Sequence, residues 1–459
     1  MSDESAIRQS AIPPLKLHNK IGYGLGDFAS SMSWTFIGSY FAIFLTDMAG
    51  IPAGIVSIIL LVTKIWDAVN DPMVGAIEER TKSKWGRFRP WILWSALPLA
   101  AANIMCFTAP FKTITGMVAW AVAGYVLVDT FYGFVNLGYG ALSTTMTYDP
   151  KERTELNSWR TIGNNLGGIV LGGLTMPCVL FFSGGHKPVT HGYTIAAMIF
   201  SFLAIPLFVI VFFTTREVVK PLRKENISVI ESIRATVTNR PLVFIFIIIM
   251  CFAFTLTMHM SMSVYYYMYN LGRPDMIAPL MMIASILCTV TVYIFKNIID
   301  RVGKIKMLII SNVVFIVSLS GLFLINPVDQ LPLVFVFQAI FGIAMGIGQP
   351  IYFALVPEAI DYYEDKTNIR ADGVSYTSIS LATKIGSAVG SSLGIAILAI
   401  FGYAANAQQT AHSLTGINIA ANGVPIIFCV LSIGITLFYP LSTAKNTEIR
   451  ARLEAKRDT

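Results

Sequence analysis

Residues 52–91 read PAGIVSIILLVTKIWDAVNDPMVGAIEERTKSKWGRFRPW. The stretch opens with an apolar run that is long enough to cross a bilayer as a helix, for which roughly 20 residues suffice. Lys64, Asp67 and Asp71 interrupt this run. Because a charge at bilayer depth costs roughly 2.5–3.5 kcal/mol, such side chains are expected to face a cavity or a partner within the protein. The stretch therefore predicts a membrane-spanning helix with a polar face.

Apolar runs of this length recur from one end of the chain to the other. Of the 459 residues, 55% are hydrophobic and 13% are charged, whereas about a quarter of a soluble domain is charged. This composition excludes a soluble enzyme, a disordered chain and a disulfide-stapled secreted scaffold, and the continuous runs favour helices over barrel strands. The twelve predicted spans are 21–46, 52–77, 90–110, 116–144, 158–182, 193–214, 241–268, 277–297, 305–326, 332–355, 373–401 and 421–441.

The basic residues predict how these spans are oriented. Of the 33 Lys and Arg residues, 28 lie in alternate loops and in the two tails, whereas the opposite loops contain only Lys112, Lys187 and Arg273. The basic segments are 1–20, 78–89, 145–160, 215–240, 296–306, 356–372 and 442–459. Because cytoplasmic loops carry such an excess, we expect a multi-pass protein of the bacterial inner membrane type with both termini in the cytoplasm. The net charge of +7 then requires no nucleic-acid partner.

The longest basic loop divides the chain into two halves. The predicted domains are the tail 1–20, a bundle at 21–214, the linker 215–240, a second bundle at 241–441 and the tail 442–459. The sequence YGAL at 139–142, at the end of span four, has a counterpart in YFAL at 352–355, at the end of span ten. The charged segment 79–87 after span two likewise corresponds to 300–304 after span eight. Two internal sequence similarities at corresponding places in the two halves predict a duplicated architecture.

The charges in span two share one face of the predicted helix. Lys64, Asp67 and Asp71 follow i, i+3, i+7 spacing, with Asn70 beside them. Two carboxylates one turn apart repel each other unless a cation or a proton lies between them, so this face could bind a small cation through oxygen ligands or hold a proton. The alternative is structural: Lys64 neutralises one Asp, and the other caps the span.

Two further spans carry polar side chains. Those of span four fall close to one face: Asp129, Tyr132, Asn136 and Tyr139. An aromatic and amide stripe suits sugar rings and hydroxyls, but it could equally form hydrogen bonds between packed helices. Span eleven carries a run of hydroxyl residues that includes Ser380, followed by Lys384. For Lys384, the structural alternative is a salt bridge to a span-two Asp.

The sequence contains no sign of catalysis or of ATP-driven pumping. It has no GxxxxGK[ST] loop, no hydrolase motif and no channel filter of the TVGYG kind. The five cysteines lie in apolar runs without a CxxC pair and are expected to be buried small hydrophobes. They are Cys106, Cys178, Cys251, Cys288 and Cys429. Charges spread over several spans favour a central cavity, and therefore a secondary carrier that is not an enzyme and needs no cofactor.

Five motifs, spread over nearly the whole chain, resemble the glycoside–pentoside–hexuronide:cation symporters, the group of the major facilitator superfamily that contains melibiose permease. They are KIGYGLGD at 20–27, KIWDAVNDPMVG at 64–75, TKSKWGRFRPW at 81–91, DPKERTELNSWR at 149–160 and PEAIDYYEDKTNIRADGVSY at 357–376. The resemblance implies an all-α membrane protein of twelve transmembrane helices in two pseudo-symmetric six-helix bundles, the major facilitator fold. It also implies alternating access around a midplane site.

The resemblance assigns roles to individual residues. It implies a coupling-ion site, for H+ or Na+, at Asp67, Asn70 and Asp71. Lys384 would connect this site to the sugar site, and Arg160 matches an Arg that opens span five. The expected substrate-binding residues are Asp27, Ser31, Asp129, Tyr132, Asn136, Tyr139, Arg160, Ser380 and Lys384.

Several positions depart from the pattern of melibiose permease. Gly133 replaces a Thr of its cation site, which favours H+ over Na+. Ser31 and Asn136 replace two sugar-binding Asp residues, and Gly140 replaces a sugar-stacking Trp. Melibiose itself is therefore not expected, and the segment around Asn136 looks more like the glucuronide and xyloside branches.

These departures leave the charge of the substrate open. If the lost carboxylates make the site positive, a substrate carboxylate would pair with Lys384 or Arg160. If Asp27 or Asp129 restores the balance, the substrate is neutral.

The sequence thus predicts a symporter, expected to be a monomer, that imports a sugar, glycoside or hexuronide together with H+ or Na+. One alternative is a facilitator-fold carrier of another solute such as a lysolipid, which the polar run on span eleven disfavours. The other is a non-transporting sugar sensor, which usually carries a longer cytoplasmic extension than 442–459.

Overall fold

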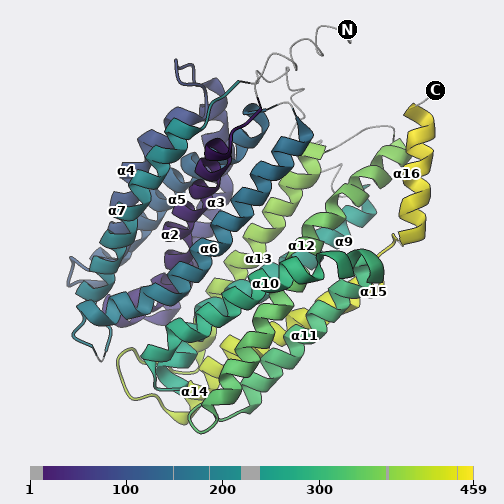
Figure 1. Ribbon diagram of the computed structural model, residues 1–459. Helices are drawn as coiled ribbons and strands as arrows, with labels where there is room; N and C mark the ends of the chain where they lie inside the picture. Colours follow the sequence, from purple (N-terminus) through teal and green to yellow (C-terminus); the bar gives the residue numbers. More distant parts are fainter. Residues whose placement is uncertain are drawn as a thin grey trace. The chain divides into compact units, whose positions relative to one another are not determined.

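The computed structural model describes residues 14–147, 149–185, 187–218, 238–367, 372–441 and 443–457. Within these ranges every regular element is a helix, and no strand occurs. The chain divides into two units, Met1–Lys224 and Glu225–Thr459, drawn in purple to teal and in green to yellow in Figure 1. The division lies inside the segment 215–240, of which residues 219–237 are outside the described ranges.

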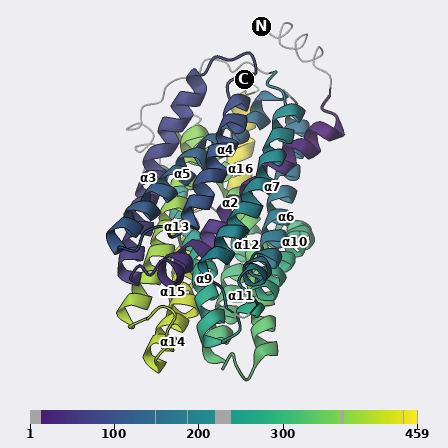
Figure 2. The same ribbon diagram turned by 90° about the vertical axis from the view of Figure 1, so that its left-hand side faces the viewer.

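The described part of the first unit contains a long helix for each of the first six predicted spans. These are α2 (Leu17–Ile43, continued by the π-helix η1, Phe44–Met48), α3 (Ala53–Arg80), α4 (Arg89–Cys106), α5 (Ile114–Thr145), α6 (Pro150–Phe182) and α7 (Thr190–Thr214). Helix α2 packs against α6 and α7, whereas α3 and α4 both pack against α5. Helix α4 also packs against α7, as the turned view in Figure 2 shows.

The second unit repeats this arrangement. Its elements are α9 (Arg240–Tyr265, continued by η2, Tyr266–Asn270), η3 (Pro274–Met276), α10 (Ile277–Val302), α11 (Lys304–Leu324), α12 (Leu331–Thr367), α13 (Asp372–Ile400), α14 (Ala411–Asn418), η4 (Ile419–Gly423), α15 (Val424–Leu437) and α16 (Thr443–Arg457). Helix α9 packs against α13 and α15, α10 and α11 pack against α12, and α11 also packs against α15. Each of these pairs has its equivalent in the first unit, so the duplicated architecture predicted from the sequence echoes is confirmed.

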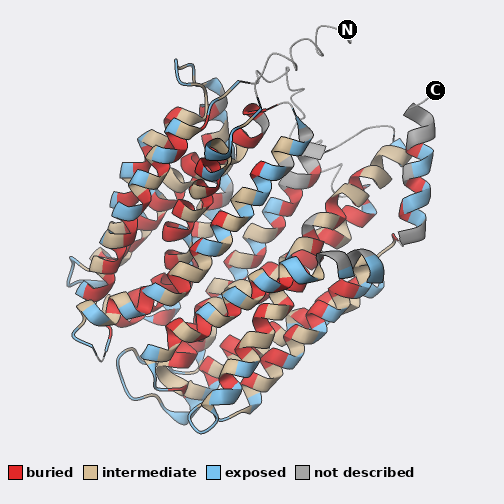
Figure 3. Cartoon of the chain, viewed as in Figure 1, coloured by how far each residue is buried: buried red, intermediate tan, exposed pale blue. Residues whose placement is uncertain are grey.

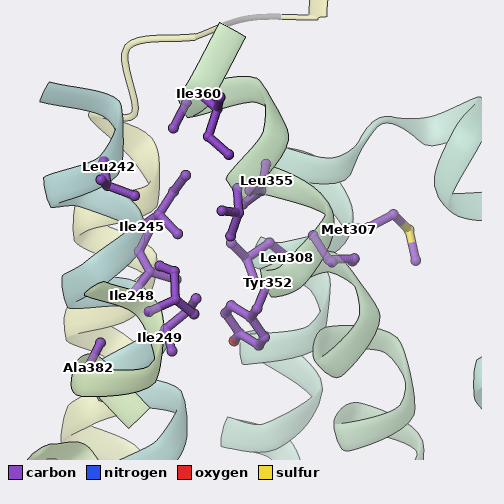
Figure 4. Close-up of a cluster of buried hydrophobic side chains, with 14 of the residues drawn as sticks. Leu242, Ile245, Ile248, Ile249, Met307, Leu308, Tyr352, Leu355, Ile360 and Ala382 are labelled. Atoms are coloured by element: carbon purple, nitrogen blue, oxygen red, sulfur yellow. The ribbon is translucent and has the colours of Figure 1, made fainter. Parts of the chain in front are cut away.

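The second unit has a large apolar core. In the second unit, Leu242 and Ile245 on α9 face Leu355 and Tyr352 on α12, all with no more than 1% of their surface exposed (Figure 4). Buried positions lie along the faces that neighbouring helices turn toward each other (Figure 3). The opposite faces carry exposed large apolar side chains such as Ile65, which is 60% exposed, and this pattern suits a helix whose outer face contacts lipid.

Eleven helical segments of the described ranges are long and apolar enough to cross a membrane. The exception is α4, which corresponds to the predicted span 90–110. It has only 18 residues and includes Arg89 in its first turn. All five cysteines are free thiols; four are buried and Cys178 is partly exposed.

Several segments predicted as loops are partly helical, among them 402–420, which contains α14. Helix α6 begins at Pro150, well before the predicted start at 158, because Asp149 caps it and proline suits the first position of a helix. The Asp149 carboxylate accepts a hydrogen bond from the backbone N–H of Lys151 at 2.9 Å. Helix α12 continues to Thr367, through most of the predicted loop 356–372.

The C-terminal tail 442–459 also contains a helix, α16, which packs on the extension of α12. Ile449 and Leu453 are buried beside Tyr362, and Arg452 forms an ion pair with Asp365 at 2.8 Å. Hydropathy did not reveal these helical segments because their apolar residues are spaced among charges, as expected for amphipathic helices.

The contact between α2 and α6 depends on the absence of side chains. A Cβ at Gly163 on α6 would lie 2.0 Å from the backbone oxygen of Gly24 on α2. The two helix backbones are therefore in direct contact at this level, as small residues permit in membrane helices.

We expect Gly163→Ala to lower the stability of the protein, because the added methyl group meets backbone that cannot move aside. Overpacking of this kind typically costs about 1–3 kcal/mol. Gly168→Ala on the same helix is the matched control, since nothing lies within 4 Å of its Cβ position. The measurement is the apparent melting temperature of the purified protein in detergent. Equal melting temperatures for the two variants would contradict the close helix contact.

Candidate substrate and ion site

Polar side chains from α2, α3, α5 and α6 meet inside the first unit. We call Tyr23, Asp27, Asn136, Tyr139 and Arg160 the Arg160 cluster. We call Trp34, Lys64, Asp67, Tyr125 and Tyr132 the Lys64 cluster. Both clusters form because the packing of α2 on α6 and of α3 on α5 brings their polar faces together.

The Arg160 cluster is organised around one ion pair. The Arg160 Nε donates to Asp27 Oδ2 at 2.8 Å, and Arg160 Nη2 donates to Asn136 Oδ1 at 3.5 Å. The Asp27 side chain is 9% exposed and that of Arg160 is 30% exposed. The guanidinium carbon also lies 5.0 Å from the centre of the Tyr139 ring. Arg160 is therefore neutralised by a carboxylate of its own unit, yet its guanidinium stays partly accessible.

Two tyrosines support this ion pair. The rings of Tyr23 and Tyr139 stack with their centres 4.5 Å apart. The Tyr139 hydroxyl donates to the backbone oxygen of Tyr23 at 2.6 Å, and the Tyr23 hydroxyl donates to the backbone oxygen of Tyr139 at 3.2 Å. A Cβ at Gly26 would lie 2.3 Å from the Tyr139 ring, so only glycine leaves room for it. At Gly140 a Cβ would lie 3.4 Å from Arg160 Nη1, so the guanidinium borders the space beside this glycine.

The Lys64 cluster holds a buried ammonium group. Lys64 Nζ lies 3.7 Å from Asp67 Oδ2, and both side chains are 10% exposed. The same ammonium lies 4.2 Å from the ring centre of Trp34 and 5.6 Å from that of Tyr125. Trp34 in turn stacks on Tyr132, with ring centres 4.9 Å apart. Lys64 and Asp67 therefore form an ion pair within α3.

The remaining candidates for ion binding lie between α3 and α5. Asn70 Nδ2 donates to the backbone oxygen of Asp129 at 3.4 Å. A Cβ at Gly133 would lie 3.1 Å from Asn70 Nδ2 and 3.9 Å from Asp71 Oδ1. Asp67, Asn70 and Asp129 are at most 7% exposed, and Asp71 is partly exposed. Position 133 thus adjoins the expected ion site, but its glycine offers no side-chain oxygen.

Four predicted substrate residues are not members of either cluster: Ser31, Asp129, Ser380 and Lys384. The Ser31 hydroxyl donates to the backbone oxygen of Asp27 at 2.8 Å and lies against Gly167 of α6. Ser380 and Lys384 belong to α13 in the second unit, where Ser380 is exposed and Lys384 is partly buried. The first unit therefore brings together Asp27, Asn136, Tyr139 and Arg160, and separately Lys64, Asp67 and Tyr132.

Sequence reasoning missed three aromatic members of the clusters. Trp34 lies seven residues after Asp27 and so shares its helix face, a signal that was available from the sequence. Tyr125 lies four residues before Asp129, again on the same face. Tyr23 likewise lies four residues before Asp27, but its contact with the Tyr139 ring depends on another helix and could not be predicted from spacing.

The sequence matches known transporters over almost its whole length. The family model described as MFS/sugar transport protein matches residues 22–443. The isoprimeverose transporter of Lactiplantibacillus pentosus is 29% identical, over 98% of this chain and 94% of that protein. The putative glycoside/cation symporter YagG of Escherichia coli is also 29% identical, over 96% and 94%. The glucuronide carrier protein homolog of Escherichia coli is 27% identical, over 95% of each chain.

Solved structures show the same fold at much lower identity. A bacterial homolog of the human lysosomal transporter Spinster, inward-facing and occupied, has a TM-score of 0.67 at 14% identity, over 96% of this chain and 98% of that one. The nucleoside transporter NupG has a TM-score of 0.60 at 14% identity, over 93% and 98%. These neighbours support the helical architecture and say nothing about what is transported.

Proposed function

Because the chain belongs to the MFS/sugar transport protein family, we propose that it is an H+-coupled symporter that imports a neutral glycoside. The proposed substrate residues are Asp27, Ser31, Asp129, Tyr132, Asn136, Tyr139, Arg160, Ser380 and Lys384. The proposed ion site consists of Asp67, Asn70 and Asp71. In alternating access, the ion and the sugar would each favour binding of the other, so that the gradient of the ion drives uptake of the sugar.

The proposal that the substrate is neutral depends on the Asp27–Arg160 ion pair. An acidic sugar would need a free cation, but Arg160 already has a buried carboxylate at 2.8 Å. Three cationic side chains of the clusters and the proposed sites, Lys64, Arg160 and Lys384, accompany four carboxylates. These are Asp27, Asp67, Asp71 and Asp129. A substrate carboxylate would therefore enter a region with an excess of like charge, where repulsion is strong because the dielectric is low.

A neutral sugar suits the same groups. The carboxylate of Asp27 accepts hydrogen bonds from hydroxyls, the amide of Asn136 can accept or donate them, and the exposed part of Arg160 retains N–H donors. The names of the relatives include both a glycoside and a glucuronide carrier, so similarity alone does not choose between the two classes. The ion pair is the feature that supports the neutral one.

The same excess of carboxylates supports a cationic coupling ion. A proton needs only one carboxylate, whereas a metal cation needs several oxygen ligands in one shell. Gly133 contributes none where it adjoins Asn70 and Asp71. This supports H+ over Na+.

Competition between paired substrates tests the proposal. In proteoliposomes, counterflow of a glycoside should be inhibited at least about tenfold better by a glucoside than by the glucuronide with the same aglycone, since one such charge mismatch is worth more than 1.4 kcal/mol. Uptake of the glycoside driven by a pH gradient in the absence of Na+ tests whether the coupling ion is H+. A glucuronide that competes as well as the glucoside would refute the neutral substrate, and strict Na+ dependence would refute the proton.

We also propose that both termini and the 215–240 linker are cytoplasmic, as the basic residues favour. A reporter that is active only in the cytoplasm should be active when fused after Lys224 and after Thr459. The same reporter inserted at Lys187 should be silent. A silent fusion at either of the first two positions would overturn this orientation.

A further inference from the structure

One aromatic side chain connects the two proposed sites. Trp34 on α2 stacks on Tyr132 of α5 with an angle of 19° between the rings. Its indole also contacts the Lys64 ammonium at 4.2 Å, and that ammonium lies 3.7 Å from Asp67. Asp67, Lys64, Trp34 and Tyr132 therefore form a continuous series of contacts from the ion site to a proposed sugar-binding residue.

The sugar end of this series is Tyr132. Its hydroxyl interacts electrostatically with the charged groups of Asp27, Arg160, Asp67 and Asp129. Asn136 follows Tyr132 by one helical turn, a rise of about 6 Å, which is comparable to the width of one sugar ring. A glycosyl group that binds to the Arg160 cluster would therefore reach the Tyr132 ring, which is partly exposed.

The ion end of the series is the Lys64 ammonium. The groups that act on it are the carboxylates of Asp67 and Asp129, the hydroxyl of Tyr125 and the indole of Trp34. A proton on Asp67 removes one of its counter-charges. The Lys64 ammonium is then attracted less strongly to Asp67. Its cation–π interaction with the negative face of the Trp34 indole becomes more important in setting its position.

We propose that Trp34 is a positioning residue that transmits the charge state of Asp67, through Lys64, to the Tyr132 ring on which the sugar rests. This inference rests on the proposed function, because it needs a sugar at Tyr132 and a coupling ion at Asp67. Contacts alone do not make a coupling pathway, so the test must measure coupling directly.

The measured quantity is the ratio of the sugar KM at alkaline pH to that at acidic pH, taken from counterflow in proteoliposomes without an ion gradient. In the unmodified protein this ratio should exceed one, since protonation promotes sugar binding. Trp34→Leu should reduce the ratio at least about threefold, because it removes the aromatic face. Trp34→Phe should give an intermediate ratio, because phenylalanine keeps a weaker face.

Trp94→Leu is the matched control. Trp94 lies on α4 of the same unit, is 48% exposed and, among the aromatic rings of the described residues, contacts Trp85 and Trp91. The substitution Trp94→Leu should leave the KM ratio unchanged. If loss of a tryptophan merely impaired folding, Trp34→Leu and Trp94→Leu would both lower the rate of counterflow. Neither variant would then differ from the other in the ratio of KM at alkaline pH to KM at acidic pH.

Tryptophan fluorescence gives a second readout that needs no sugar. The chain has seven tryptophans, and a shift from alkaline to acidic pH should change their emission. Trp34→Phe should abolish most of this change, whereas Trp94→Phe should retain it. Indole emission depends on a nearby charge, so a purely structural role of Trp34 would not produce this difference.

The outcomes separate the inference from the proposed function. If the unmodified protein transports a glycoside with a pH-dependent KM and Trp34→Leu keeps the same ratio, the inference is wrong and the proposed function stands. If the KM of the unmodified protein does not change with pH, both proton coupling and the inference fail. If no glycoside gives counterflow, the proposed function itself fails, and the inference fails with it.

Discussion

Asp67→Asn should abolish uphill accumulation of the sugar while leaving counterflow measurable. The substitution removes the carboxylate that would take the coupling ion, so binding of sugar and binding of ion become independent. Coupling energies of this type correspond to roughly 5–150-fold changes in affinity, and we expect accumulation to fall at least about tenfold. Asp71→Asn should have the same direction of effect. The measurement is uptake against a gradient in proteoliposomes, compared with exchange in the same vesicles.

Asp67→Asn also leaves the Lys64 ammonium buried without the carboxylate at 3.7 Å. Breaking a buried ion pair by removing one partner costs about 3–5 kcal/mol, so lower stability is expected as well. The double variant Lys64→Met, Asp67→Asn removes both charges and should regain stability without regaining accumulation. Glu155→Gln, at the exposed ion pair with Lys20, serves as the control and should accumulate sugar normally. Undiminished accumulation by both Asp67→Asn and Asp71→Asn would refute the proposed ion site.

Asp27→Asn should shift the preference of the carrier from neutral toward acidic sugars. The substitution removes the charge that neutralises the Arg160 guanidinium, which is then available to a substrate carboxylate in a bidentate pair. Hydrogen bonds to charged groups are worth about 1.5–3 kcal/mol, so the ratio of glucuronide to glucoside competition should rise at least about tenfold. Paired competition in counterflow measures this ratio.

Two further variants test whether Arg160 causes the expected shift of Asp27→Asn toward acidic sugars. Arg160→Gln should impair both substrates, because it removes the donors and leaves Asp27 buried without its cation. The double variant Asp27→Asn, Arg160→Gln removes both charges and should show no gain for the glucuronide. If Asp27→Asn weakens glucoside and glucuronide equally, Arg160 does not set the charge preference.

The sequence by itself determined the membrane architecture. Continuous apolar runs have no stable alternative to helices in lipid, since every backbone polar group must be satisfied within the segment. This is why the spans and the all-helical class could be predicted residue by residue. The ends were less well predicted at α6 and α12, where the helix continues into charged segments that hydropathy assigns to loops. Helix geometry also placed Lys64, Asp67 and Asp71 on one face without knowledge of any other helix.

Only the tertiary structure decided which of these side chains meet. Asp27 and Arg160 are separated by 133 residues, and no spacing rule connects them; they pair because α2 packs against α6 at the level of Gly24 and Gly163. Trp34 of α2 reaches Lys64 of α3 because both helices contact α5. Periodicity describes one helix at a time, whereas the charge balance of a binding site depends on contacts between helices. For this reason the sequence left the charge of the substrate open, and the paired guanidinium of Arg160 supports a neutral one.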